Sequence, residues 1–329
     1  MEAIALGNTG LKTPAIGFGC GALLGRSGRK ESLAALEAAW DQGIRFFDTA
    51  RAYGYGESEG LLGEFLRGRR DQAVIATKFG IMPAKQSAWK GMAKSAARSL
   101  LKLAPSAHKM LQKTAGSQFT HGQFTIPVLQ QSIEESLRKL KTETVDMLFL
   151  HAAPASVLEK HDLLDAMHRL VEQGKVRVAG LSGDPADVAI ALERNPPQLG
   201  AMQFPCNVFD VSAATSYAQL NGSQRALVAN HPFGGAARVG QTREALTALS
   251  QNSSIPVELR EKLAAMDDGL LADAVLNMIL RDSGIHIVIP AMMKLYHIGV
   301  CIEAVSHSRF TSAEIALLRQ HFAGVTAAA

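Results

Sequence analysis

The feature of the sequence that most constrains the fold is a repeated alternation of short apolar runs and amphipathic segments. Eight runs of apolar or β-branched residues, each too short for a helix, alternate with stretches whose apolar residues recur at helical spacing. The runs are centred on Ile16, Phe47, Ile75, Phe149, Val178, Met202, Val228 and Val288. This order predicts an α/β protein with a single (β/α)8 TIM barrel, one domain over residues 1–329. The alternative, a doubly wound open sheet, lacks its usual phosphate-binding fingerprint here.

The N-terminal region has its own pattern. Residues 2–16 contain two short segments around the turn-forming Gly7-Asn8-Thr9-Gly10, which predicts a β-hairpin leading into the barrel. The glycine-rich run from Gly17 to Gly21 follows, where small residues allow a ligand or another backbone to approach closely. Its G-x-G-x-G spacing is not a Rossmann fingerprint, because no helix follows directly.

Composition excludes several classes of protein. A hydrophobic content of 47% with 19% charged residues is typical of a globular protein with a large core, and no stretch is long and apolar enough for a transmembrane segment. The N-terminus lacks signal-peptide features. The three cysteines lie far apart, which favours free thiols in the cytoplasm and no metal site. The formal net charge of +4 is mostly a local excess, so we expect no nucleic-acid partner, and nothing specifies an oligomeric state.

That local excess lies in a long segment between the third and fourth strands, residues 80–125. Its part from Ala84 to Lys113 contains seven lysines and arginines and no acidic residue, interleaved with apolar side chains. One interpretation is a basic amphipathic helix that binds an anionic surface, a membrane interface or an acidic ligand. We favour the other, an insertion that packs over the barrel mouth as a lid.

Polar, titratable residues stand at the ends of three consecutive predicted strands. Asp48 and Tyr53 follow the second strand, Lys78 ends the third and His151 ends the fourth. Taken singly, each has an ordinary structural explanation, such as a turn cap or a solvated cation. The C-terminal ends of all strands in a barrel meet on one face, so we expect these four side chains to share a pocket.

Such a set suits proton transfer to a carbonyl oxygen. A tyrosine with a pKa of about 10 is a poor acid–base catalyst near neutrality, but a nearby ammonium favours its phenolate and lowers that pKa. Lys78 would supply the ammonium, Asp48 would hold Lys78, and His151 would donate to the same oxygen and orient the substrate. This chemistry requires no metal.

With these residues, the chain resembles the aldo-keto reductase superfamily over nearly its whole length. The segments that carry the resemblance are Leu6–Leu11, Gly17–Gly19, Phe47–Ala50 with Tyr53-Gly54, Ala76–Lys78, Ser136–Leu140, Asp146 and Leu150-His151. The resemblance implies a (β/α)8 barrel with an N-terminal hairpin and a catalytic tetrad of Asp48, Tyr53, Lys78 and His151. It also implies NADP(H) or, less often, NAD(H) as cofactor, with a hydride passed to an aldehyde or ketone.

The resemblance further implies cofactor-binding positions. Ser182 and Gln203 match the residues that hold the carboxamide, the loop of Gly19, Cys20 and Gly21 lies near the nicotinamide, and Asp48 also touches the ribose.

Three positions depart from the family pattern. Gly183 replaces a usual asparagine, which removes a hydrogen bond to the amide. Asn230-His231-Pro232-Phe233 replaces an aromatic residue before a Ser-Pro-Leu turn, so His231 or Phe233 is the expected stacking partner of the nicotinamide. After Pro290, only Lys294 offers a cation for a 2′-phosphate, so we expect NADP(H) to be favoured over NAD(H), but not strongly.

Two functions from different classes follow. The favoured one is an oxidoreductase acting on a small-molecule aldehyde or ketone, or on the corresponding alcohol or aldose, with Tyr53 as general acid and base. The alternative is a catalytically weak barrel that serves as a cofactor-binding regulatory or interaction module. The complete tetrad favours the enzyme, because a binding module has no need of an activated tyrosine.

Overall fold

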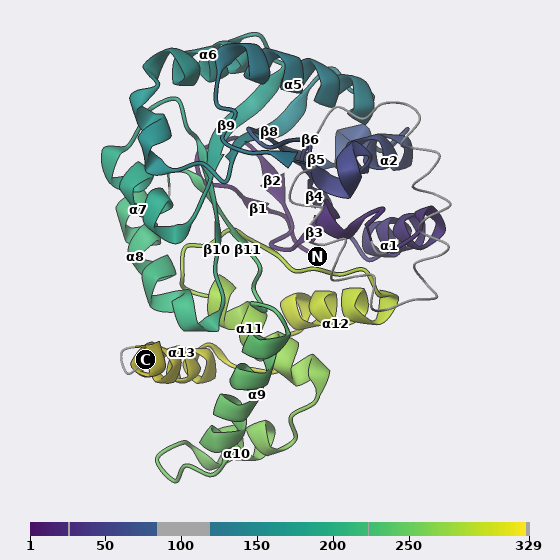
Figure 1. The fold of residues 1–329 in the computed structure, drawn as a ribbon. Coiled ribbons are helices and arrows are strands. Elements are labelled where there is room, and N and C mark those ends of the chain that lie inside the picture. The colour runs from purple at the N-terminus through teal and green to yellow at the C-terminus, as the bar shows by residue number, and fades with distance from the viewer. Residues whose placement is uncertain (26, 84–118, 223, 327–329) are drawn as a thin grey trace, which may run out of the picture.

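The computed structural model describes residues 1–25, 27–83, 119–222 and 224–326, and its centre is one sheet of eight parallel strands (Figure 1). In spatial order the strands are β3 (Gly17–Gly19), β4 (Phe46–Asp48), β5 (Val74–Phe79), β8 (Val145–His151), β9 (Val176–Ser182), β10 (Ala201–Pro205), β11 (Ala226–Asn230) and β12 (Ile287–Ile289). A parallel bridge between Ile16 and Val288 joins the two edges, so the sheet closes on itself. The prediction of a (β/α)8 barrel is confirmed, and the doubly wound alternative is wrong.

Helices surround the strands and cover their outer faces (Figure 1). The helices of the described residues are α1 (Arg29–Asp41), α2 (Ser58–Phe65), α5 (Ile126–Leu140), α6 (His161–Glu172), α7 (Pro185–Arg194), α8 (Val211–Asn221), α9 (Ala236–Ser250), α10 (Val257–Ala264), α11 (Asp268–Leu280), α12 (Leu295–Ser306) and α13 (Ser312–Thr326), of which α9, α10 and α13 lie away from the sheet. In α5, Leu129, Ile133 and Leu137 recur at helical spacing and are buried. The Thr125 side chain caps this helix by accepting from the Val128 N–H.

Two helices were not predicted from the sequence. α9 and α10 pack on each other at the end of the molecule far from α5 and α6 (Figure 1). α9 buries only Thr242, Leu246, Leu249 and Ser250 of its 15 residues. Because half of this small buried face is polar, the sequence shows no apolar stripe there.

The barrel interior is built from alternate strand residues. Its apolar cluster contains Phe46, Val74, Ala76, Met147, Phe149, Val178, Ala201, Ala226, Val228, Ile287 and Ile289, together with Leu6 and Leu11. The last two flank the turn of the predicted hairpin, which forms from β1 (Ile4–Ala5) and β2 (Lys12–Thr13). Side chains alternate across a strand, so Lys78, two residues beyond Ala76, and His151, two beyond Phe149, also point inward.

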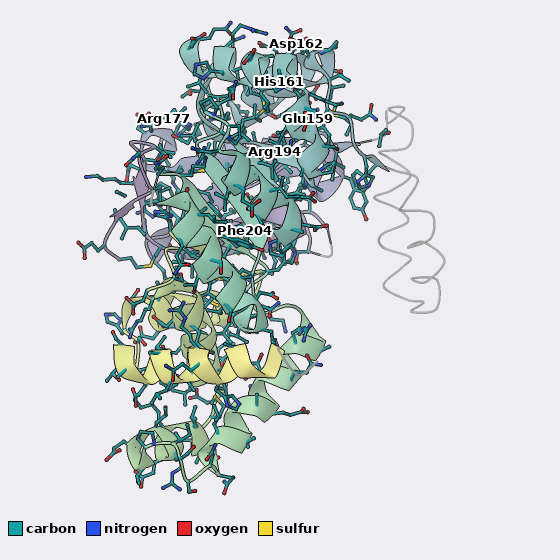
Figure 2. The ribbon with its side chains drawn as sticks, turned by 90° about the vertical axis from the view of Figure 1, so that its left-hand side faces the viewer. Glu159, His161, Asp162, Arg177, Arg194 and Phe204 are labelled. Carbon is teal, nitrogen blue, oxygen red and sulfur yellow. The ribbon has the colours of Figure 1, made fainter. Side chains whose placement is uncertain are left out.

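The other strand residues point toward the helices. Phe204 of β10 packs edge to face on Tyr217 of α8, with ring centroids 5.2 Å apart, and Figure 2 shows its position among the outer elements. The same face carries exposed ion pairs, such as Glu159 with Arg194 of α7 (Figure 2).

The insertion begins and ends in a short antiparallel ribbon of β6 (Met82–Pro83) and β7 (Phe119–Thr120). Residues 84–118 of the predicted lid, which include its whole basic part from Ala84 to Lys113, lie outside the described residues. Among the helices that are described, none has the length and apolar character needed to cross a membrane.

Candidate active site

Asp48 and Tyr53 lie at the end of β4 and in the turn that follows it. Asp48 is the last residue of β4 and is buried, and Tyr53 opens the 3-10 turn Tyr53–Gly56. Gly54 and Tyr55 adopt φ angles of 58° and 57°, so this turn is left-handed at two successive residues. A Cβ on Gly54 would lie 2.8 Å from the Leu23 carbonyl oxygen, so only glycine fits there.

Lys78 connects these two side chains. Its Nζ lies 2.6 Å from both carboxylate oxygens of Asp48 and 3.4 Å from the Tyr53 hydroxyl. It also donates to the Thr49 carbonyl at 3.0 Å. The structure therefore brings Asp48, Tyr53 and Lys78 together at adjacent strand ends. The contact with Thr49 had no signal in the sequence, because the group involved is a backbone carbonyl.

Burial and charge act in opposite directions on the Tyr53 phenol. Burial raises its pKa, the Lys78 ammonium lowers it, and the net result lies above the ordinary value. The net direction is opposite to the one expected from the ammonium alone. Burial would by itself lower the pKa of Lys78, but the Asp48 carboxylate and Tyr53 outweigh that effect and raise it. A protonated phenol therefore stands beside a charged ammonium at neutral pH.

His151 completes the group from β8. Its ring meets the Tyr53 ring edge-on, with centroids 5.7 Å apart. Burial, with smaller contributions from Lys78 and His121, lowers the pKa of His151 to about 3. Its Nδ1 is buried and has no hydrogen-bond partner among the described residues. His151 is therefore neutral near pH 7 and can act as a hydrogen-bond donor but not as a cation.

Ser182 and Gln203 extend the site across the barrel interior. Ser182 Oγ donates to Gln203 Oε1 at 2.9 Å, and Gln203 Nε2 donates to Asp48 Oδ1 at 2.9 Å. Both residues are buried, as Asp48 is. Gly183 follows, and a Cβ there would lie 2.7 Å from the Ala153 carbonyl oxygen, so the asparagine of the family pattern does not fit this backbone.

The glycine-rich loop lies against Tyr53. A Cβ on Gly21 would lie 3.7 Å from the Tyr53 ring, and one on Gly19 would lie 3.1 Å from the Ile289 side chain. The thiol of Cys20 is fully buried beneath this loop, and burial raises its pKa well above the ordinary value. Small residues thus keep space open beside the phenol, while the thiol stays protonated.

The remaining predicted positions belong to the loop after β11 and to the start of α12. His231 has a φ of 53°, and its exposed ring bonds to the Asn230 side chain at 2.8 Å. Phe233 is half-buried against the outer core. Lys294 is exposed and stands at the N-terminus of α12. Among the described residues, no hydrogen bond, ion pair or ring contact connects any of these three to Tyr53, so their assignment to the cofactor remains a prediction.

Comparison with known proteins gives consistent results. The family model described as "Aldo/keto reductase family" matches residues 15–323. L-galactose dehydrogenase of Arabidopsis thaliana is 31% identical over 207 residues, which cover 60% of this chain and 53% of that protein. The matched stretches span about half the length of the curated relatives.

Solved structures share the fold at low identity. The holo form of aldo-keto reductase AKR11C1 from Bacillus halodurans superposes with a TM-score of 0.70 at 19% identity, over 99% of this chain and 96% of that one. An aldo/keto reductase from Klebsiella pneumoniae, in complex with NADP and acetate, gives a TM-score of 0.63 at 22% identity, over 98% and 96% of the two chains.

Proposed function

Because the chain belongs to the aldo/keto reductase family, we propose that it is an NAD(P)H-dependent oxidoreductase that interconverts a carbonyl compound and its alcohol, with Tyr53 as general acid and base. The observation that carries the proposal is the position of Lys78 Nζ, 2.6 Å from both Asp48 oxygens and 3.4 Å from the Tyr53 hydroxyl. This arrangement gives a phenol at the mouth of the barrel a fixed positive neighbour.

The buried polar groups beside Asp48 are suited to a nicotinamide. Ser182 and Gln203 offer a hydroxyl and an amide, which complement the donor and acceptor of a carboxamide. In the described structure they satisfy each other, so the carboxamide would exchange with this internal bond. When bound, the cofactor would supply the hydride that the carbonyl carbon accepts.

The protein supplies the proton. During reduction, the Tyr53 hydroxyl donates its proton to the substrate's carbonyl oxygen, and the Lys78 ammonium stabilises the phenolate that forms. Burial raises the pKa of Tyr53 above its ordinary value, so the phenol holds its proton at neutral pH and is ready for reduction. Neutral His151 orients the carbonyl oxygen through a hydrogen bond.

The relatives indicate a class of substrate and a cofactor to test first. L-galactose dehydrogenase is named for an aldose, which supports an aldose or another hydroxyaldehyde as the substrate of this chain. A structural neighbour holds NADP, and the exposed Lys294 at the N-terminus of α12 offers a cation for a 2′-phosphate. These points support NADP(H) over NAD(H). A cytoplasmic location is supported by Cys20, Cys206 and Cys301, which are buried free thiols.

The test is NADPH oxidation with an activated aldehyde such as 4-nitrobenzaldehyde, and NADP⁺ reduction with L-galactose. Tyr53→Phe is expected to lower kcat at least about a hundredfold, because it removes the proton donor and keeps the ring. Tyr217→Phe, which removes a hydroxyl on α8 and keeps the packing on Phe204, is the matched control and should retain activity. Equal activity of the two variants would refute the role of Tyr53. Failure of both NADPH and NADH to bind would refute the proposed oxidoreductase function.

A further inference from the structure

A closed ring of buried polar contacts lies behind Lys78, on the side of β5 that faces the helices. Arg51 Nη1 donates to Glu59 Oε2 at 3.0 Å, and these side chains are only 4% and 1% exposed. Glu59 Oε1 accepts from the Thr77 hydroxyl at 2.7 Å. Thr77 directly precedes Lys78, and the Lys78 carbonyl accepts from the Arg51 N–H at 3.4 Å, which closes the ring.

The ring joins the two segments that hold the proposed catalytic groups. Arg51 lies between Asp48 and Tyr53 in the loop after β4, and Thr77 lies beside Lys78 in β5. Because successive strand residues point to opposite faces, Thr77 reaches outward to Glu59 of α2 while Lys78 reaches inward to the site. Motion at either end of the ring would therefore change the distance between Lys78 Nζ and the Tyr53 hydroxyl.

The position of Glu59 in the sequence carries a signal for its burial. Glu59 lies three and seven residues before the buried Leu62 and Leu66, so it is an acid on the apolar face of its helix. A buried acid on such a face requires partners, and Arg51 and Thr77 supply them.

Stability alone is a poor explanation for this pair. A buried ion pair usually contributes no more to stability than well-packed apolar side chains would, because both charges lose their hydration. Arg51 Nε is moreover buried without a hydrogen-bond partner among the described residues. What the pair does provide is a fixed geometry between two segments of backbone.

We propose that Glu59, through Arg51 and Thr77, is a positioning residue that holds the Lys78 ammonium at its working distance from the Tyr53 hydroxyl. This inference rests on the proposed function, in which Lys78 stabilises the Tyr53 phenolate. If the ring is loosened, the ammonium moves away from the phenol, the phenolate loses its stabilisation, and proton transfer slows.

The structure offers a matched pair of substitutions for the test. Thr77 and Ser136 both donate to the same oxygen, Glu59 Oε1, at 2.7 Å, and both are buried. They differ in their location, because Thr77 adjoins Lys78 in β5 while Ser136 lies on α5. Thr77→Val and Ser136→Ala therefore remove equivalent hydrogen bonds to Glu59. The first is made by the residue next to Lys78 and the second is not.

Two readouts distinguish positioning from general stability. Thr77→Val is expected to lower kcat about tenfold with KM for the carbonyl substrate within about twofold, and Thr77→Ser should restore most of the rate. Ser136→Ala should lower the thermal unfolding midpoint as much as Thr77→Val does, but keep kcat within about twofold of wild type.

The second readout is the ultraviolet titration of the Tyr53 phenol. The chain has 4 tyrosines, so the Tyr53 signal is obtained as the difference between each variant and the same variant with Tyr53→Phe added. Its pKa should rise in Thr77→Val and not in Ser136→Ala.

Equal loss of kcat in Thr77→Val and Ser136→Ala, or an unchanged Tyr53 titration in Thr77→Val, would overturn the proposal. If Thr77→Val does not fold, Glu59→Gln takes its place in both measurements, with the same expected direction. The titration needs neither substrate nor cofactor. A wild-type protein without reductase activity would therefore refute the proposed function, while the titration would still decide the positioning role.

Discussion

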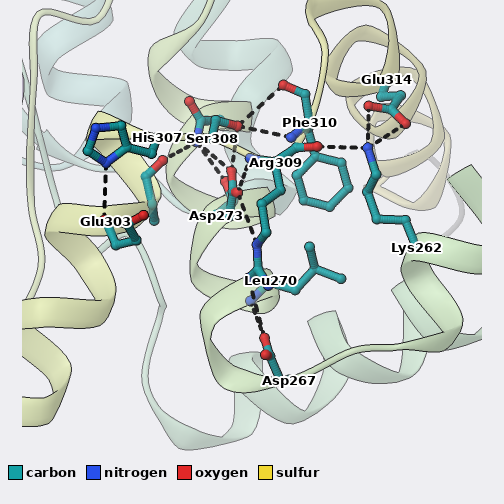
Figure 3. A network of polar contacts seen from close by, with 12 residues as sticks. Lys262, Asp267, Leu270, Asp273, Glu303, His307, Ser308, Arg309, Phe310 and Glu314 are labelled. Atoms are coloured by element: carbon teal, nitrogen blue, oxygen red, sulfur yellow. Dashed lines mark hydrogen bonds and ion pairs between the residues drawn. The ribbon is translucent and has the colours of Figure 1, made fainter.

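Two polar networks in this protein use the same chemical groups in different surroundings. The ring behind the candidate site pairs Arg51 with Glu59, whose side chains are 4% and 1% exposed. The second network connects α10, α11, α12 and α13 (Figure 3). One of its guanidinium–carboxylate pairs, Arg309 with Asp267, is 47% and 64% exposed. Water screens the second pair and hardly reaches the first, so similar contacts should differ several-fold in energetic effect.

The second network also contains one buried member. Asp273 of α11 is 1% exposed and accepts from the Ser308 hydroxyl and the Arg309 N–H, both at 2.6 Å (Figure 3). Its contacts hold the connection between α12 and α13 and touch none of the residues in the candidate site. Substitutions at Asp273 and at Glu59 therefore both remove a buried carboxylate, one remote from the candidate site and one beside it.

The largest effect is expected from Glu59→Ala. This substitution removes the nearer carboxylate of the buried Arg51 guanidinium and leaves it only the partly exposed Glu135, at 3.5 Å. Breaking a buried pair in this way costs about 3–5 kcal/mol. Urea unfolding followed by circular dichroism would measure the loss. The double variant Arg51→Met with Glu59→Leu should lose much less, because no unpaired charge remains. A loss below about 1 kcal/mol for Glu59→Ala would remove the contrast between the networks.

The next effect concerns two histidines and pH. Burial lowers the pKa of His151 to about 3, whereas the unfolded chain binds that proton near pH 6.5. The unfolded state therefore binds more protons between these values, and stability falls as the pH decreases from about 6.5. At about pH 4.5 the loss due to His151 is on the order of 2–3 kcal/mol.

The measurement is the unfolding free energy at several pH values for wild type, His151→Gln and His307→Gln. His151→Gln should flatten the decline between about pH 6.5 and 4.5. His307 belongs to the second network, and its side chain is 74% exposed beside Glu303, so His307→Gln serves as the exposed control (Figure 3). Identical slopes for wild type and His151→Gln would contradict the assigned burial effect.

The barrel could be predicted from the sequence because its strands are short apolar runs bounded by breakers. Runs such as Val74–Thr77 are rich in β-branched residues, and the side chains on both faces of the strand are buried. A polar residue at the C-terminal end of such a run must lie at the same rim of the barrel as those of the other strands. Asp48, Lys78 and His151 were placed near one another on this ground alone. The local pattern and the global topology agree in this part of the chain.

Other parts could not be predicted, for physical reasons. α9 presents few buried apolar residues, so its helical period is hidden. The net direction of the Tyr53 pKa depends on how much burial opposes Lys78, and no sequence pattern reports that balance. Nor does a sequence show that Arg51 and Thr77 both reach Glu59, because those contacts arise only when β4, β5 and α2 are packed.

A smaller loss of unfolding free energy is expected from Asp273→Ala, which removes a buried carboxylate that is remote from the candidate site. The substitution removes the acceptor of the Arg309 N–H and leaves the Ser308 hydroxyl only its longer contact to the Phe310 carbonyl, at a cost of about 2 kcal/mol. Because Asp273 contacts no residue of the candidate site, kcat should stay within about twofold of wild type. A kcat that fell as far as in Thr77→Val would mean that general destabilisation explains both results.

The smallest effect is expected from Arg309→Gln. Its guanidinium lies 3.3 Å from Asp267 in an exposed pair, and its Nε lies 3.7 Å from the buried Asp273, beyond hydrogen-bond length. The exposed pair is worth less than about 1 kcal/mol and weakens as salt screens it. Unfolding at low and high salt should show a small difference that disappears at about 1 M. The Arg309 N–H still reaches Asp273 in this variant, because that bond is made by the backbone. A loss as large as that of Asp273→Ala would show that the exposed guanidinium contributes as much to stability as the buried carboxylate. Burial would then not explain the difference between the two networks.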